Sequence, residues 1–214
     1  MERLDTGFYR RDDVVAVARE LLGKVLCTSI DGRPTKVVIE ETEAYAGVED
    51  RASHAYGGRR TRRTEPMFGK GGIAYVYLCY GIHHLFNVVT ATADVPHAVL
   101  VRAASPLEGL ATMLERRGKS SADKSLLAGP GSLSRALGIR TEMTGTSLLG
   151  RRIWIEDHGI EPAEDTITVG PRVGIDYAGE DALRPYRFRI AGRRGSSPES
   201  AAAGTSALRD SAGR

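Results

Sequence analysis

The stretch KVLCTSIDGRPTKVVIEETEAY, residues 24–45, places two runs rich in β-branched residues on either side of DGRP. Asp-Gly between two such runs is typical of a β-hairpin. A second hairpin or tight bend is predicted near Tyr80 and Gly81, inside the β-rich segment 73–90. Further strands are predicted at 97–104, 151–157, 166–175 and 184–190. Because strands follow strands more often than helices, the sequence predicts an α+β fold with a curved, mixed or antiparallel sheet, peripheral helices and a protruding hairpin.

Capping signals predict helices in three segments, 11–23, 105–118 and 129–138. In the segment SPLEGLATMLERRG, Ser105 is expected to be the N-cap and Pro106 the first helical residue. Glu108 would complete a capping box, and Gly118 would end the helix.

The chain has 214 residues, of which 41% are hydrophobic, so it is long enough for one well-packed domain and short for two. We assign this domain to residues 1–192. The segment 193–214 contains no large apolar residue except Leu208 and is expected to be a disordered tail. No apolar run approaches the roughly 20 residues of a membrane span. We therefore expect a soluble, cytoplasmic protein, nucleoid-associated if the source is bacterial.

Motifs for nucleotide cofactors and metals are missing. The sequence has no P-loop, no G-x-G-x-x-G after a strand, no H-E-x-x-H and no G-x-S-x-G. His83 and His84 would point to opposite faces of a strand, and no third ligand has suitable spacing. Cys27 and Cys79 lack C-x-x-C spacing and are expected to be reduced thiols. The sequence thus supports neither a cofactor nor a metal site.

Charge is unevenly distributed, although the net charge is only +3. Residues 40–50 contain five carboxylates and no basic residue, whereas six basic residues and only one acid, Glu65, occupy 51–70. The basic segment is either a solvated loop or a strip that binds phosphate. Its four clustered arginines are Arg59, Arg60, Arg62 and Arg63.

Glu43 lies among other carboxylates and aromatic residues, a setting that raises the pKa of a carboxyl group and suits a general base. The alternative is a glutamate on the solvent face of a strand. Tyr75 and Tyr77 share one strand face by parity, and either pack within the sheet or stack on a ligand. Tyr80 stands at a bend, where exposure of a bulky aromatic ring is costly unless a partner covers it.

Three further polar residues each have two interpretations. His54, in the polar segment RASHAYGG, has either a structural role or a role in a site. Asn87, inside the apolar run LFNVVT, either bonds a buried backbone group or faces a site. Arg102, which ends a predicted strand, can pair with the acidic cluster or reach a phosphate.

Taken in order, five segments closely resemble the 3-methyladenine DNA glycosylase family of the alkyladenine type, which is distinct from the helix-hairpin-helix glycosylases. They are ETEAY, DRASHAYGGRRTRRTEPMF, AYVYLCYGIHHLFNVV, AVLVRAASPLEGL and LAGPGSLSRALGI. The resemblance covers roughly residues 5–190. It implies a base-excision-repair enzyme that acts on double-stranded DNA containing damaged purines, without a cofactor.

The resemblance also implies roles for matched residues. Glu43 corresponds to the catalytic base that activates the attacking water, and Arg102 to an arginine near that water and a phosphate. Residues that would bind the extruded base are Tyr45, His54, Tyr77 and Asn87.

At the second hairpin, the resemblance makes Tyr80 the side chain that intercalates into the DNA, with Ile82 beside it where vertebrate relatives have methionine. The four clustered arginines would hold the DNA backbone. The segment PYRF, 185–188, departs from the usual family ending, which bears on lesion preference.

The implied activity is flipping of alkylated or deaminated purines and hydrolysis of the N-glycosidic bond, with 3-methyladenine, 7-methylguanine, hypoxanthine and ethenoadenine as substrates. Tyrosine faces are expected to attract the cationic methylated purines. Nothing resembles the activated lysine of a glycosylase that also cleaves the strand, so a monofunctional, monomeric enzyme is expected, with no membrane partner. A non-catalytic module that binds distorted DNA, or hydrolysis of another sugar or nucleotide substrate, are the alternatives.

Overall fold

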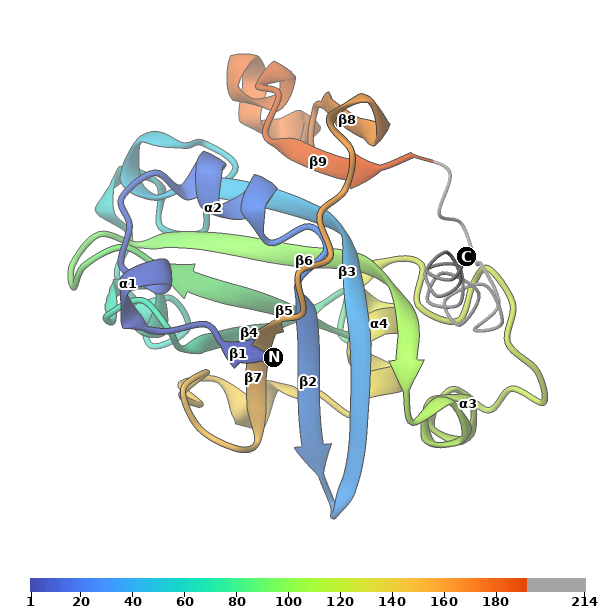
Figure 1. Cartoon of the computed structure of the whole chain (residues 1–214). Helices are drawn as coiled ribbons and strands as arrows, with labels where there is room; N and C mark the ends of the chain where they lie inside the picture. The colour runs from blue at the N-terminus through green and yellow to red at the C-terminus, as the bar shows by residue number, and fades with distance from the viewer. Residues whose placement is uncertain (192–214) are drawn as a thin grey trace, which may run out of the picture.

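The long strand β3, Arg33–Ala46, lies at the centre of the sheet in the computed structural model of this chain, which describes residues 1–191 (Figure 1). One edge of β3 pairs first with β2, Val25–Ile30, and further along with β9, Arg187–Ile190. The other edge pairs with β6, His97–Glu108. This strand therefore connects both parts of the sheet.

All the strand pairs are antiparallel in residues 1–191, and the order β1-β7-β2-β3-β6-β5-β4 runs across the sheet, with β8 paired to β9. The remaining strands are β1 (Glu2–Arg3), β4 (Ala74–Cys79), β5 (His83–Thr90), β7 (Ile153–Asp157) and β8 (Ile167–Gly170). The α+β class with an antiparallel sheet is confirmed. The expected tail at 193–214 lies outside the described residues.

Both predicted hairpins are present, and both turns use left-handed backbone. Asp31 and Gly32 join β2 to β3 with φ values of 56° and 69°, as a tight hairpin turn requires. Tyr80 and Gly81, with φ values of 50° and 74°, lie in the turn between β4 and β5. A left-handed tyrosine is uncommon because its Cβ crowds the backbone, so this turn is a strained position.

Helices cover the edges and faces of the sheet (Figure 1). The α-helices are α1 (Thr6–Tyr9), α2 (Val14–Glu20), α3 (Leu110–Arg117) and α4 (Pro130–Leu137). The short 3-10 helices are η1 (Gly47–Glu49), η2 (Tyr56–Gly58), η3 (Glu65–Phe68), η4 (Thr141–Met143), η5 (Glu164–Thr166) and η6 (Asp176–Leu183). Helix α2 begins at the capping residue Asp13, whose side chain accepts a hydrogen bond from Ala16 N.

The predicted start of α3 is wrong, although its end at Gly118 is confirmed. Ser105 and Pro106 belong to β6, where they pair with Val38 and Val37 of β3. The helix begins only at Leu110, after Gly109. Pairing with the central strand outweighs the local capping signal, because the capping pattern carries no information about the neighbouring strand.

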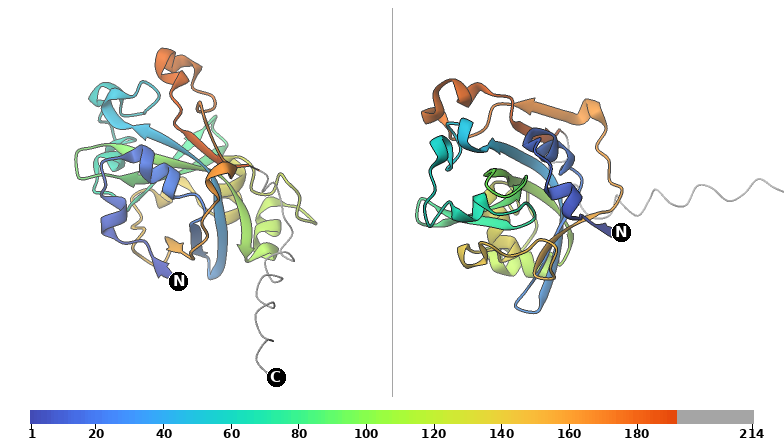
Figure 2. Two further views of the ribbon diagram at one scale, coloured as in Figure 1. Left: turned by 45° about the horizontal axis from the view of Figure 1, so that its top comes forward. Right: turned by 90° about the vertical axis from the view of Figure 1, so that its left-hand side faces the viewer.

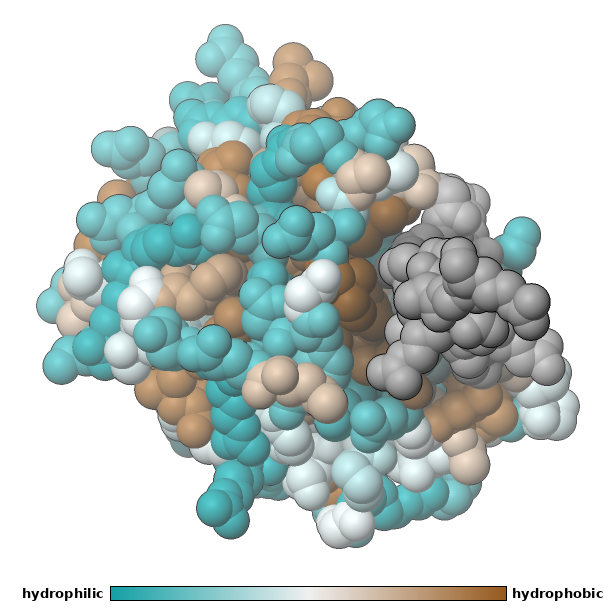
Figure 3. Space-filling model, viewed as in Figure 1, coloured by the Kyte–Doolittle hydropathy of each residue, from teal (hydrophilic) through white to brown (hydrophobic). Residues whose placement is uncertain are grey.

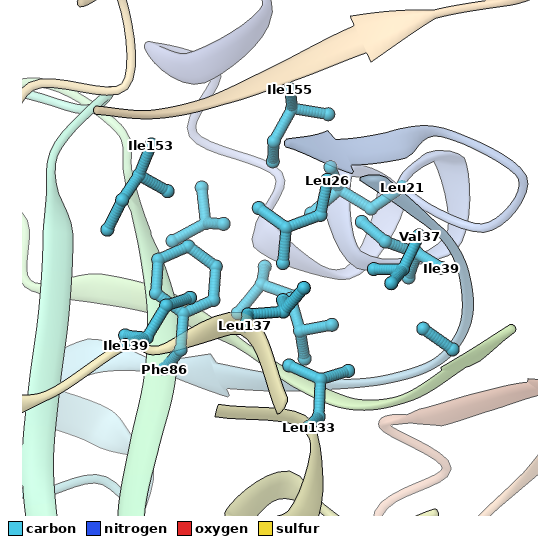
Figure 4. Close-up of a cluster of buried hydrophobic side chains, with 14 of the residues drawn as sticks. Leu21, Leu26, Val37, Ile39, Phe86, Leu133, Leu137, Ile139, Ile153 and Ile155 are labelled. Atoms are coloured by element: carbon cyan, nitrogen blue, oxygen red, sulfur yellow. The ribbon is translucent and has the colours of Figure 1, made fainter. Parts of the chain in front are cut away.

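The main core lies between the sheet and helices α2 and α4. Leu21 comes from the end of α2, and Leu133 and Leu137 from α4. In Figure 4 these side chains meet Ile39 and Phe86 of the sheet. This core fixes one side of the sheet.

The outer surface is mainly hydrophilic on the face seen in Figure 3, where hydrophobic residues gather in a hollow beside the grey atoms. Within residues 1–191, no helix has the length and apolar character needed to cross a membrane.

Candidate active site

A cavity of about 650 Å³ opens at the end of the sheet where β3, β4 and β5 meet the loop after β3 and the segment before η6. The views in Figure 2 place that loop beside η6, and Arg51 N donates a hydrogen bond to the Asp181 carboxylate there at 2.8 Å. The volume lies in the range typical of small-molecule pockets. The predicted residues that line the cavity are Tyr45, His54, Arg63, Tyr77, Tyr80, Asn87 and Arg102.

Glu43 lies directly behind the cavity wall, with its side chain fully buried. The Tyr45 hydroxyl donates to Glu43 Oε2 at 2.9 Å, and the Val173 main-chain N–H donates to Oε1 at 2.8 Å. Tyr45 and Val173 both line the cavity. Two hydrogen bonds therefore hold the Glu43 carboxylate, and both donors belong to residues that line the cavity.

Burial raises the pKa of the Glu43 carboxyl, whereas Arg102, the Val173 amide and the Tyr45 hydroxyl lower it, and burial dominates. The Arg102 guanidinium is 3.4 Å from Glu43 but only 2.8 Å from Glu41, so its close ion pair is with Glu41. Glu43 thus lies beside the Arg102 guanidinium, but the shorter ion pair of Arg102 is with Glu41.

Two bulges shape the strand pair that carries these charges. Between β3 and β6, Ile39 pairs with Ala104 and Glu41 with Ala103, which leaves Glu40 as an extra residue in β3. The next pair skips Arg102 in β6. Bulges re-aim side chains next to sites, and here the bulge directs Arg102 toward both glutamates.

Glu41 also accepts a hydrogen bond from Arg187 Nε at 2.8 Å. This carboxylate thus joins β3, β6 and β9. Together with Glu40 and Arg102, it lines a second cavity of about 750 Å³. The carboxylates of β3 therefore have different surroundings. Glu40 and Glu41 line the second cavity. Glu43 is held by Tyr45 and Val173, which line the first cavity, and by Arg102, which lines both.

Aromatic rings form one wall of the first cavity. His54 Nδ1 and the Tyr75 hydroxyl are 2.8 Å apart, and the His54 ring is edge-on to Tyr77 with centroids 4.6 Å apart. Burial, followed by the charges of Arg63 and Arg59, lowers the pKa of His54 to about 4, so this histidine is neutral at pH 7. A neutral imidazole can offer one donor and one acceptor.

Asn87 bonds buried backbone groups, which is one of its two interpretations, and it also lines the cavity. Its Nδ2 donates to the main-chain oxygens of Tyr75 at 3.0 Å and Leu85 at 3.2 Å, and the residue lines the cavity. Both donors are directed to backbone oxygens, so the side chain is fixed in the wall.

Tyr80 and Ile82 stand at the tip of the β4–β5 hairpin and are 89% and 71% exposed. Leu78, on the same hairpin, is 43% exposed. Such an exposed apolar tip at the mouth of a cavity is a typical contact surface for a partner.

The four clustered arginines are all exposed but differ in their contacts. Arg60 is bound by Glu65 at 2.7 Å and Asp94 at 2.7 Å, so its charge is largely neutralised. Arg63 lies over the ring of Tyr77. Arg59 and Arg62 have no carboxylate within ion-pair distance in residues 1–191. The structure therefore separates the four residues that the sequence groups together.

Sequence reasoning missed Val173, whose contribution is a main-chain amide and leaves no signal in residue type. It also missed Arg172, whose fully buried guanidinium bonds the Asp50 carboxylate and lies 4.8 Å from the centroid of the Tyr45 ring. The lone arginine in GPRVGI could have been noted, because a charged residue inside a predicted strand needs a partner when buried.

Metal ligation finds no support in the part of the chain that the structure describes, since no group of three or more His, Cys, Asp or Glu side chains could hold an ion. His84 instead accepts a hydrogen bond from Thr141 N at 3.2 Å.

Known proteins resemble this chain over most of its length. The profile of the methylpurine-DNA glycosylase family matches residues 7–194. A relative from Chlamydia felis (strain Fe/C-56), provisionally named a 3-methyladenine DNA glycosylase, is 47% identical over 188 residues, which cover 87% of this chain and 95% of the relative. Relatives of the same provisional name from Desulfitobacterium hafniense (strain Y51) and Bacillus cereus (strain B4264) are 47% and 46% identical over 197 residues. These alignments cover 89% and 87% of this chain, and 96% and 94% of the relatives. This chain therefore belongs to the methylpurine-DNA glycosylase family and is a DNA glycosylase of DNA repair.

Proposed function

We propose that this protein flips alkylated or deaminated purines out of duplex DNA and hydrolyses their N-glycosidic bond with a water activated by Glu43. The substrates proposed are 3-methyladenine, 7-methylguanine, hypoxanthine and ethenoadenine, and the product is an abasic site. The observation that carries this proposal is the buried carboxylate of Glu43, held by Tyr45 and Val173 at the wall of an aromatic cavity. The names of the relatives support 3-methyladenine as one substrate.

Access to a base inside a duplex requires flipping, which costs a few kcal/mol. Tyr80 is exposed at the hairpin tip and also lines the cavity, so it can enter the stack while the base enters the pocket. Stacking of a base on an aromatic ring contributes about 1–3 kcal/mol, which offsets much of the cost. Ile82 would contact the DNA beside this wedge.

In the reaction, a water oxygen forms a bond to C1′ while the bond from C1′ to the purine nitrogen breaks, and the base leaves with the electron pair. Glu43 accepts a proton of the water, and its negative charge stabilises the positive charge that develops on the sugar. Arg102, the Val173 amide and the Tyr45 hydroxyl favour the ionised form of Glu43, which opposes the effect of burial. These contacts support a carboxylate that is ready to act as a base.

The groups around Glu43 are a phenol, an amide and a guanidinium. None of them forms an imine with a sugar, so we propose simple hydrolysis without strand cleavage. Tyr45, His54 and Tyr77 would stack on and edge the extruded base. Asn87, fixed by its two backbone bonds, would exclude the 2-amino group of guanine. The enzyme would act as a monomer.

The test is base release from a duplex carrying one hypoxanthine, ethenoadenine or 7-methylguanine, with enzyme in excess. Wild-type protein should release the base, and Glu43→Gln should slow release by at least about a hundredfold while DNA binding persists. Glu49→Gln is the control, because Glu49 is exposed in the adjoining η1 helix. Full activity of Glu43→Gln would refute the mechanism, and binding without release by wild type would favour a non-catalytic module.

A further inference from the structure

Two cavity tyrosines each have a guanidinium group over the ring. Arg63 Cζ is 5.3 Å from the centroid of Tyr77, and Arg172 Cζ is 4.8 Å from the centroid of Tyr45. Tyr45, Tyr77 and Arg63 line the same cavity, so the Arg63 guanidinium lies where an extruded base would be received, whereas the Arg172 guanidinium is fully buried and does not line the cavity. The attraction between a ring face and a cation is therefore already used within the protein.

Arg63 differs from its neighbour Arg60 in what balances its charge. Arg60 bonds Glu65 and Asp94, whereas no carboxylate lies within ion-pair distance of Arg63 in the described chain. The Arg63 guanidinium lies over Tyr77, so its charge is close to the aromatic wall, and it adds to the effect of burial in lowering the pKa of His54. Its positive charge at the cavity mouth is thus largely uncompensated.

The charged residues that line the cavity, within residues 1–191, are Arg63 and Arg102, and none is an aspartate or glutamate. The Glu43 carboxylate lies behind the wall and faces Arg102, which also pairs with Glu41 at 2.8 Å. A purine that enters with a positive charge would meet the charge of Arg63, since the charge of Arg102 is balanced by Glu41 and Glu43, whereas a neutral purine would meet aromatic and polar groups without this repulsion.

We propose that Arg63 is a specificity-determining residue that favours neutral damaged purines, such as hypoxanthine and ethenoadenine, over the cationic methylated purines. This inference rests on the proposed function. The guanidinium occupies the face of Tyr77 that would otherwise attract a cationic base, and it repels such a base directly. A neutral purine tolerates the guanidinium, because a planar cation packs on an uncharged aromatic system.

The experiment compares Arg63→Met with wild type on two duplexes that differ only in carrying hypoxanthine or 7-methylguanine. Single-turnover rates with saturating enzyme remove differences in DNA affinity, and the ratio of the two rates removes differences in the active fraction. Loss of the charge should raise the rate on 7-methylguanine relative to hypoxanthine by about threefold to tenfold. Arg63→Lys, which keeps the charge, should stay much closer to the wild-type ratio.

Arg62→Met is the matched control, because it removes the same charge from the same exposed loop but does not line the cavity. It should weaken DNA affinity and leave the ratio unchanged. An unchanged ratio in Arg63→Met would overturn the inference and would indicate that Arg63 leaves the cavity for the DNA backbone. Failure of wild type to release any base would instead refute the proposed function, so the two failures are distinguishable.

Discussion

Removal of the Tyr45 hydroxyl should shift the pH dependence of base release. This hydroxyl donates to Glu43 Oε2 at 2.9 Å and lowers the pKa of that carboxyl. In Tyr45→Phe the ring remains for stacking, but the ionised carboxylate loses one of its donors. The pKa of Glu43 in the free enzyme, already raised by burial, should therefore rise further.

The size of the shift follows from the strength of the lost bond. A hydrogen bond to a charged group contributes about 1.5–3 kcal/mol, and one pKa unit corresponds to about 1.4 kcal/mol. The acid limb of the rate profile should thus move to higher pH by about one to two units. Activity falls as pH decreases because a protonated Glu43 cannot accept the proton of water. At a pH below both limbs, the variant should be about tenfold to a hundredfold slower than wild type.

The assay is single-turnover release of hypoxanthine from a duplex at a series of pH values, with enzyme in excess over DNA but below saturation, so that the second-order rate constant reports groups of the free enzyme. Tyr75→Phe is the control, since its hydroxyl contacts His54 and not Glu43. Its acid limb should coincide with that of wild type. If Tyr45→Phe leaves the acid limb in place while Tyr75→Phe behaves as expected, the hydroxyl does not tune Glu43, and the assignment of Glu43 as the titrating base is refuted.

Two other predictions concern folding and DNA binding. Because burial lowers the pKa of His54 to about 4, the unfolded chain alone binds a proton between about pH 6.5 and pH 4, and stability should fall through this window by at most about 3 kcal/mol. Urea unfolding of His54→Gln should show a weaker dependence on pH, and an equal dependence would contradict the assigned shift. Arg62→Met should reduce the slope of log affinity against log salt by about 0.9, whereas Arg60→Met, whose side chain is paired with Glu65 and Asp94, should change it little. Equal slopes for the two variants would show that these ion pairs open on DNA.

The amino-acid sequence by itself determined both hairpins and the class of fold. Asp31-Gly32 needs no distant partner to form a tight turn, since the left-handed conformation is a local preference. The β-rich runs on either side show where the strands lie, and their close succession implies an antiparallel sheet. Residue type also marked Tyr80 at the hairpin tip and the tyrosines of the aromatic wall as candidates, but their proposed roles came from the family resemblance alone.

Only the tertiary structure decided how these residues are arranged. Ser105 and Pro106 carry a local signal for a helix, yet they pair with β3, because strand pairing depends on a neighbour far away in the chain. The bulge at Arg102 and the amide of Val173, 130 residues after Glu43, likewise arise when separate segments meet. Main-chain donors and bulges have no residue code, so the surroundings that set the charge of Glu43 follow from folding and not from local sequence.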